Sequence, residues 1–229
     1  MILAISWSGG KDSYLAYHFA KEQGHDVRYA IHMFIEDNSF YHGPEELIYA
    51  QATQCLGMKL FTARTTWTSY EKDFKNILRQ LRSLGVEGIV YGDLYIEDHR
   101  KWGTRVAEEV GLVPIYPIFG LDRDYLINRF ISLGVRSMII RTLDVEPYRN
   151  YLSKIIDHEL FSELIMREAD PLGEGGEYHT LVLDAPYMKC FIEVLEGYVD
   201  IVKSVFSGKE YVYRIYVPRK YRIINKSSM

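Results

Sequence analysis

The chain has 229 residues, 48% hydrophobic and 14% aromatic, with a formal net charge of −4 at pH 7. This apolar content can bury a sizeable core, which excludes a disordered chain, a collagen-like repeat and a disulfide-stapled miniature. The apolar runs are far shorter than the roughly 18 residues of a membrane span, and the net charge argues against a nucleic-acid-binding surface, so we expect a soluble protein that binds neither membrane nor nucleic acid.

Apolar segments rich in Ile, Val and Tyr alternate along the chain with segments of helical periodicity. This alternation is typical of βα units around a parallel sheet, and it predicts an α/β fold. The first helix is expected to bury one apolar face, which carries Leu15 and Phe19. The strands expected in the first part of the chain cover residues 2–6, 27–34, 58–63 and 88–92, and the helices cover residues 13–23, 45–56 and 70–84.

A change in composition after Arg141 predicts a domain boundary near residue 145, because residues 144–150 are polar and contain Pro147. We expect a parallel-sheet domain at residues 1–145 and an α+β region at residues 146–229. In the second region the pattern predicts a helix over residues 151–167 and strands over residues 180–183, 190–195, 199–206 and 211–217, separated by Gly197 and Gly208. The chain then ends in several basic residues, which we expect in a solvated tail: Lys209, Arg214, Arg219, Lys220, Arg222 and Lys226.

The sequence contains two cysteines, Cys55 and Cys190, far apart and without a Cys-x-x-Cys pattern. This arrangement indicates neither a disulfide framework nor a cysteine zinc site, so both are predicted to be buried, reduced thiols. The N-terminal apolar run has no basic leader and passes straight into Trp7, which does not resemble a secretory signal. We therefore expect a cytoplasmic protein.

The segment Ser8-Gly9-Gly10-Lys11-Asp12-Ser13 lies between the first predicted strand and the first predicted helix. Two adjacent glycines allow a tight turn, and a helix N-terminus offers unpaired N–H groups and a favourable dipole to an anion. Lys11 adds positive charge, and Asp12 can hold the Mg²⁺ that accompanies a triphosphate. A plain helix-capping turn, with Asp12 or Ser13 as the N-cap, is the structural alternative.

This strand, Ser-Gly-Gly-Lys-Asp-Ser, helix arrangement resembles the pyrophosphate loop of the N-type ATP pyrophosphatases. It matches neither the nucleoside-triphosphatase P-loop nor the dinucleotide-binding glycine pattern. In that superfamily a substrate oxygen attacks the α-phosphate of ATP, giving an adenylate and pyrophosphate, and a nucleophile then displaces AMP. The resemblance therefore implies ATP and Mg²⁺ as cofactors, and a Rossmann-like fold of the adenine nucleotide α-hydrolase type.

A second glycine-rich segment, residues 170–180, is acidic. Its glutamates, Glu174 and Glu177, would repel a bare phosphate, so the expected guest is a cation, a metal-bound phosphate or a backbone amide. The alternative is an acidic surface turn that leads into a strand.

The stretch Gly-Glu-Gly-Gly-Glu-Tyr-His-Thr-Leu-Val-Leu-Asp-Ala-Pro at residues 173–186 resembles the signature of the diphthine-ammonia ligase family. Residues 42–52 and 91–106 resemble the segments that follow the second and fourth strands in this family, so the resemblance covers about residues 1–195. His179 stands where many members have glutamate. The chain is similar to the short archaeal form, which lacks the additional C-terminal domains of eukaryotic members.

The resemblance implies ATP-dependent amidation of diphthine, the modified histidine of elongation factor 2, to diphthamide. The diphthine carboxylate would attack the α-phosphate, and ammonium would supply the amide nitrogen while AMP and pyrophosphate leave. Elongation factor 2 is thus the expected partner, and a homo-oligomer is compatible with the sequence. A ligase of the same fold that adenylates a small carboxylic acid, or a non-catalytic adenine-nucleotide sensor, remains an alternative.

The expected site residues fall into three groups. Lys11, Asp12, Glu174 and Glu177 are expected to act in catalysis, with Asp12 also as the metal ligand. The nucleotide-binding group consists of Ser8, Gly9, Gly10, Lys11, Asp12, Ser13, His32, Gly92 and Asp93. The substrate-binding group consists of Glu97, Arg100, Gly175, Gly176, Tyr178, His179 and Thr180. The adjacent Asp98 and His99 are expected to be solvated residues of a helix start and not metal ligands.

Overall fold

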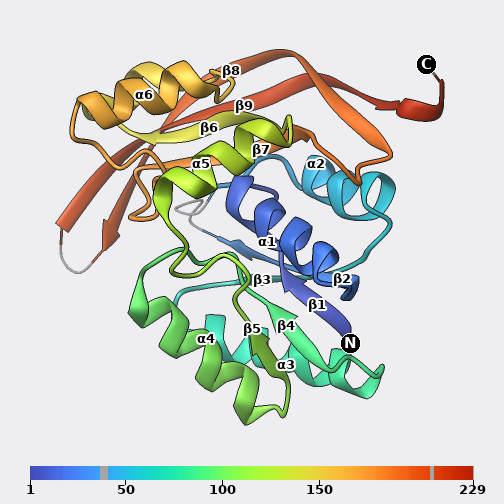
Figure 1. The fold of residues 1–229 in the computed structure, drawn as a ribbon. Helices are drawn as coiled ribbons and strands as arrows, with labels where there is room; N and C mark the ends of the chain where they lie inside the picture. The colour runs from blue at the N-terminus through green and yellow to red at the C-terminus, as the bar shows by residue number, and fades with distance from the viewer. Residues whose placement is uncertain (37–40, 207–208, 229) are drawn as a thin grey trace.

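The computed structural model describes residues 1–36, 41–206 and 209–228, which form two sheets (Figure 1). One is a five-stranded parallel sheet with the order β3-β2-β1-β4-β5. The other is a four-stranded antiparallel sheet with the order β7-β6-β9-β8. This arrangement confirms the α/β fold class, with a parallel-sheet domain and a smaller C-terminal α+β region.

The parallel sheet and its helices are built from the first part of the chain. The elements predicted there are confirmed to within two residues, except that the helix expected at residues 45–56 is divided into α2 and a π-helical turn, η1. In chain order, the elements of this part of the chain are β1 (Ile2–Ser6), α1 (Lys11–Glu22), β2 (Asp26–Ile35), α2 (Glu45–Tyr49), η1 (Ala50–Cys55), β3 (Lys59–Thr65), α3 (Tyr70–Ser83), β4 (Gly88–Val90), α4 (Glu97–Glu109), β5 (Val113–Ile115) and α5 (Arg123–Ser132).

The second sheet is built from the rest of the chain, and it begins with β6, before the boundary expected near residue 145. That boundary remains a prediction. Its elements are β6 (Arg136–Leu143), the 3-10 turn η2 (Tyr148–Tyr151), α6 (His158–Met166), β7 (Tyr178–Asp184), β8 (Cys190–Phe206), β9 (Lys209–Asn225) and the 3-10 turn η3 (Lys226–Ser228). Within the described residues, no helix is both long and apolar enough to cross a membrane.

Helix α1 lies between the two sheets (Figure 1). It was expected to bury only one face, yet every residue from Ser13 to Ala20 is buried, with Leu3 and Ile5 of β1 and Leu181 of β7 in the same apolar core. A helix that is covered all round must be central to its fold. A second core on the opposite face of the parallel sheet contains the apolar stripes of α3 and α4. The start of α1 is therefore held at the junction of both sheets.

Three expectations about the C-terminal region are wrong. The helix expected over residues 151–167 begins at His158, because Ile155 bridges to Met138 of β6 and the Asp157 side chain caps the helix by accepting the Leu160 N–H at 2.8 Å. The strands expected on either side of Gly197 form one strand, β8, with a register shift at Gly197. The basic residues expected in a solvated tail lie mainly on β9, which pairs with β8. Gly208 lies outside the described residues.

The prediction of two reduced thiols is also wrong, because Cys55 and Cys190 form a disulfide. The bond joins the end of η1 to the start of β8, and the Lys189 N–H beside it donates to the Cys55 carbonyl at 2.8 Å. Sequence spacing gave no sign of this pairing, since only the folded chain brings the two Cα atoms to 4.8 Å.

Leu78 and Leu84, in and just after α3, differ in burial, so the same substitution should cost different amounts of stability at the two positions. Leu78 is fully buried, whereas Leu84 is 49% exposed. We expect Leu78→Ala to lower the free energy of unfolding by about 3 kcal/mol, because it leaves a cavity, and Leu84→Ala to lower it by less than about 0.5 kcal/mol. Urea unfolding of the two variants measures this difference, and equal losses would contradict the assignment of the α3 stripe to the core.

Candidate nucleotide and acceptor site

The glycine loop between β1 and α1 packs directly against β7 of the second sheet. Gly9 has a φ of +81°, and a Cβ there would lie 2.4 Å from Oε1 of Gln51. At Gly10 a Cβ would lie 3.0 Å from the carbonyl oxygen of Thr180. The two glycines therefore permit both the tight turn expected from the sequence and a close approach of the two sheets.

The loop is fixed by hydroxyl groups. The N–H of Gly10 donates to Oγ of Ser8 at 3.2 Å, and the N–H of Lys11 donates to Oγ1 of Thr180 at 2.9 Å. Ser13 Oγ donates to the Gly10 carbonyl at 3.0 Å. The N-cap of α1 is Gly10 and makes no side-chain cap, which excludes the alternative in which Asp12 or Ser13 is the N-cap. A phosphate bound at the N–H groups of Gly10 and Lys11 would take the place of hydroxyl oxygens.

Lys11 is a buried ammonium group that connects this loop to the acidic glycine loop. Its side chain is 3% exposed, and Nζ lies 2.9 and 2.8 Å from the two carboxylate oxygens of Asp12. Nζ also donates to the carbonyl of Leu172 and lies 5.1 Å from the centre of the Tyr178 ring. Burial raises the pKa of Asp12, and the Lys11 charge opposes that rise. Both charges are thus paired at the start of α1.

The end of β4 brings further carboxylates to the same place. Strands β1 and β4 are parallel neighbours, and the strand order reverses between them, which is where open α/β sheets bind ligands. Gly92 follows β4 so closely on α1 that a Cβ would lie 3.0 Å from the Asp12 carbonyl carbon. Burial, and then the charges of Asp12 and Asp93, raise the pKa of Glu174 to about 7. The structure therefore brings Asp12, Asp93 and Glu174 together.

Glu174 is held by the backbone around it. Its Oε1 accepts the Leu94 N–H at 2.9 Å, and its own N–H donates to Oδ2 of Asp170 at 3.0 Å. Asp170 also accepts the Leu172 N–H at 2.9 Å and a hydrogen bond from the Tyr95 hydroxyl. This network ties the acidic glycine loop to the segment that follows β4, so the loop is not simply a surface turn.

Glu177 faces a different part of the loop. Burial raises its pKa, although the N–H groups of Glu177 itself and of Gly175 bind its carboxylate. Among the described residues, its Oε2 is buried without a hydrogen-bond partner. Gly176, which precedes Glu177, has a left-handed conformation with φ of +83°, and it turns the chain toward β7. The two glutamates are thus close in sequence, but they have different neighbours.

Tyr178 and His179 point into the protein. The Tyr178 ring is 3% exposed, and its hydroxyl donates to the Pro171 carbonyl. The His179 ring stacks on His42 with centroids 4.3 Å apart, and its Nε2 lies 3.0 Å from Nη1 of Arg141. Burial and the Arg141 charge hold the pKa of His179 well below its usual range. Their assignment to a substrate remains a prediction, and direct contact with a substrate would require the loop to open.

His32, at the carboxyl half of β2, is buried beside the loop. Its Nδ1 lies 2.7 Å from the Trp7 carbonyl, and burial lowers the pKa of the imidazole to about 4. This ring is therefore neutral near pH 7, and its expected contact with adenine remains a prediction.

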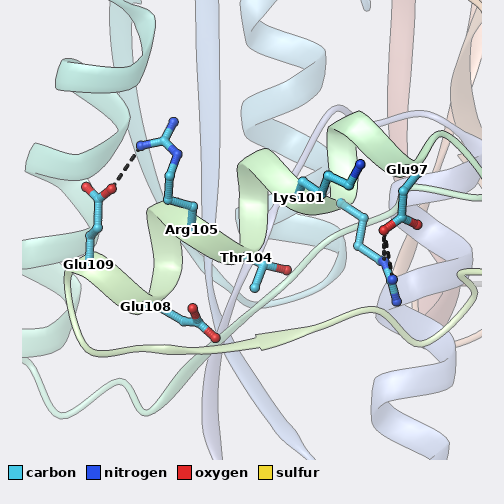
Figure 2. Close-up of a pocket in the computed structure, with 7 residues that line it drawn as sticks. Glu97, Lys101, Thr104, Arg105, Glu108 and Glu109 are labelled. Carbon is cyan, nitrogen blue, oxygen red and sulfur yellow. Dashed lines mark hydrogen bonds and ion pairs between the residues drawn. The ribbon is translucent and has the colours of Figure 1, made fainter.

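Glu97 and Arg100 pair with each other at 2.8 Å on the exposed side of α4. Both residues line a groove whose walls are side chains of α4 alone, and Figure 2 labels Glu97 and five other residues of these walls. None of the glycine-loop residues lines this groove, so the structure does not join the pair to the phosphate loop. Their assignment to substrate binding remains a prediction.

Some residues of the site were missed by the sequence analysis. His99 is 54% exposed, as expected of a helix start, but its Nδ1 lies 3.4 Å from Oδ1 of Asp93. Gln51 is fully buried and its Nε2 donates to the Gly9 carbonyl at 3.2 Å and to the Val182 carbonyl. The only sequence signal for these residues was their place in the segments that carry the family resemblance.

Two family models cover most of the chain. The model of the diphthamide synthase N-terminal domain matches residues 1–114, and that of the diphthamide synthase C-terminal domain matches residues 122–214. The chain belongs to the diphthamide synthase family. The glycine loop, Asp93 and His99 fall in the N-terminal part of the family match, whereas the acidic glycine loop falls in the C-terminal part.

Among relatives in the diphthamide synthase family, the chain is 26% identical over 206 residues to the diphthine–ammonia ligase of Schizosaccharomyces pombe. That alignment covers 80% of this chain and 34% of the yeast protein, so the chain spans about a third of this relative's length. It is also 26% identical over 219 residues to the human diphthine–ammonia ligase, covering 82% of this chain and 81% of the human protein.

A solved structure, titled as a predicted subunit of tRNA methyltransferase from Methanocaldococcus jannaschii, is 17% identical with a TM-score of 0.46. The match covers 81% of this chain and 98% of that chain.

Two substitutions of Thr180 distinguish the contribution of its hydroxyl hydrogen bond to stability from that of its side-chain volume. Thr180→Val keeps the shape but leaves the buried Lys11 N–H without its acceptor, so we expect a loss of about 1–3 kcal/mol in the free energy of unfolding. Thr180→Ser keeps the hydroxyl and should lose about 1 kcal/mol or less. Chemical denaturation measures both, and a valine variant as stable as the serine variant would contradict this role.

Proposed function

We propose that this chain is an ATP-dependent diphthine–ammonia ligase that amidates diphthine on elongation factor 2 to diphthamide. Membership of the diphthamide synthase family and the names of the two relatives support this proposal. The observation that carries it is the bridge made by Lys11, which ties the glycine loop to the acidic glycine loop at the carboxyl end of the parallel sheet. A nucleotide and an acceptor bound at these two loops would meet there.

The glycine loop would hold the triphosphate. The N-terminus of α1 supplies a favourable dipole, and the Ser8 and Ser13 hydroxyls can rotate toward phosphate oxygens. Lys11 would shift from the Asp12 carboxylate to the departing pyrophosphate and stabilise its charge. The diphthine carboxylate would attack the α-phosphate, and the resulting acyl-adenylate would contain AMP as a good leaving group.

Asp12 is suited to hold a magnesium ion, because oxygen ligands suit Mg²⁺ and Asp12 lies in the first turn of α1, beside the glycine loop. Asp12 would be the main ligand. When bound, Mg²⁺ would neutralise charge on the phosphates of ATP.

Glu174 and Glu177 would bind the ammonium that supplies the amide nitrogen. Glu174 would attract ammonium by its negative charge, and after that ammonium loses a proton to solvent, ammonia would attack the acyl carbon. The buried Oε2 of Glu177 could accept a hydrogen bond from ammonium or face the trimethylammonium group of diphthine.

The proposal predicts that AMP and pyrophosphate are released from Mg-ATP only when ammonium and diphthine-bearing elongation factor 2 are both present. Asp12→Ala should reduce the rate about a hundredfold or more, because it would remove the proposed ligand of the Mg²⁺ that neutralises the charge developing on the phosphates in the transition state. Product release and formation of diphthamide on the factor are measured together by chromatography and mass spectrometry.

The other assignments give different results in the same assay. A ligase of small carboxylic acids would be indifferent to elongation factor 2, and a nucleotide sensor would bind ATP without releasing AMP. Turnover that ignores the modified factor, or its complete absence with a folded and ATP-binding protein, would overturn the proposal.

Glu177→Gln removes the charge while keeping the size of the side chain. We expect it to raise the apparent KM for ammonium or for the modified factor about tenfold or more, since a hydrogen bond to a charged group is worth roughly 1.5–3 kcal/mol. Glu159→Gln, at an exposed position on α6, serves as the control and should change neither constant. Unchanged KM values for both substrates in Glu177→Gln would remove Glu177 from the mechanism.

A further inference from the structure

Asp93, His99 and Glu174 meet at one point, although they come from three separate segments. Asp93 follows β4, His99 lies in the first turn of α4, and Glu174 belongs to the acidic glycine loop of the second region. One oxygen or nitrogen atom of each side chain lies within 4.8 Å of the other two. The fold thus gathers two carboxylates and one imidazole at the switch point of the parallel sheet.

The spacing of these atoms is close to that of ligands around one metal ion. Two ligand atoms on a tetrahedral ion, with bonds of roughly 2.1 Å, lie roughly 3.4 Å apart. Nδ1 of His99 and Oδ1 of Asp93 already lie 3.4 Å apart. Because all three atoms lie within 4.8 Å of one another, small side-chain rotations would bring them to bonding distance.

Glu174 is supported by hydrogen bonds in the way that metal ligands are. Glu174 is oriented by the Leu94 N–H on Oε1 and by the Asp170 carboxylate on its own N–H. The Asp170 backbone N–H in turn donates to the Tyr148 hydroxyl at 3.0 Å. Hydrogen bonds of this kind fix ligand direction in metal sites. His99 is half-exposed, which leaves a path for an ion from solvent.

The local charge favours a cation over the simple ion pair of His99 and Asp93. The nearby cation Lys11 is bound to Asp12, and although its charge lowers the pKa of Glu174, burial and the charges of Asp12 and Asp93 raise it. A protonated His99 could balance one carboxylate. A divalent ion would balance both and would also use the neutral imidazole as a ligand.

We propose that Asp93, His99 and Glu174 form a binding site for a divalent transition-metal ion. The imidazole favours an ion such as Mn²⁺, Co²⁺ or Zn²⁺ over Mg²⁺, which prefers oxygen ligands. Three protein ligands leave at least one coordination position for water or a phosphate oxygen. Binding of the ion by the free protein does not depend on the proposed ligase activity.

The test is titration of the full chain with Co²⁺, without ATP, followed by its visible absorption bands and by calorimetry. We expect one ion to bind per chain, and His99→Ala and Glu174→Gln each to weaken binding about tenfold or more. Two matched controls remove the same chemistry elsewhere. Asp98→Asn neutralises the exposed carboxylate next to His99, and His158→Ala removes an exposed imidazole on α6. Both controls should bind within about twofold of the wild type.

The result that overturns the inference is absence of Co²⁺ binding, or equal affinity in the wild type and His99→Ala. Equal weakening by Asp98→Asn and Glu174→Gln would also overturn it, because it would indicate a diffuse attraction by negative charge. Thermal unfolding shows whether each variant is folded. AMP release, measured separately, tests the ligase proposal, so either proposal can fail while the other stands.

Discussion

A buried ammonium group, Nζ of Lys11, joins the two regions that make the candidate site. A buried charge is costly unless it is paired and hydrogen-bonded, and here the partners are Asp12, the Leu172 carbonyl and the Tyr178 ring. Two of these partners belong to the acidic glycine loop. The glycine loop can therefore keep its charged lysine inside the protein only while the second region is docked against it.

The central position of α1 follows from the same contact. Its first turn meets Thr180 of β7, and the residues that follow are buried by both sheets. In Figure 1 this places the second sheet over the carboxyl end of the parallel sheet, where the strand order reverses. An ordinary switch-point cleft is open on one side. In this chain the acidic glycine loop forms that side, and it brings carboxylates to the place where phosphate is expected.

This arrangement places several carboxylates close together, and their mutual repulsion determines which ligands suit the site. Burial and the negative charges of Asp12 and Asp93 raise the pKa of Glu174 to about 7. A site with this charge is poorly suited to a bare anion, but it is suited to an anion that arrives with a cation. The proposed use of a nucleotide with a metal ion, the proposed binding of ammonium and the proposed metal site at His99 would all depend on this excess of carboxylate.

The sequence by itself determined the order of βα units, because hydrophobic periodicity is local and strong in segments such as α3. It also determined the glycine loop and the acidic glycine loop, since their residue types and their place between elements carry the chemistry. These patterns indicated the α/β class and the family before any contact was known.

Only the tertiary structure decided which distant residues meet. Cys55 pairs with Cys190, and Glu174 reaches Asp93 and His99, because the second region folds back over α1. The β9 basic residues are not a tail for a similar reason, since strand pairing depends on a partner far away in the sequence. Local patterns report the backbone preference and the burial of a segment. They do not report which other segment provides its neighbours, and the site depends on those neighbours.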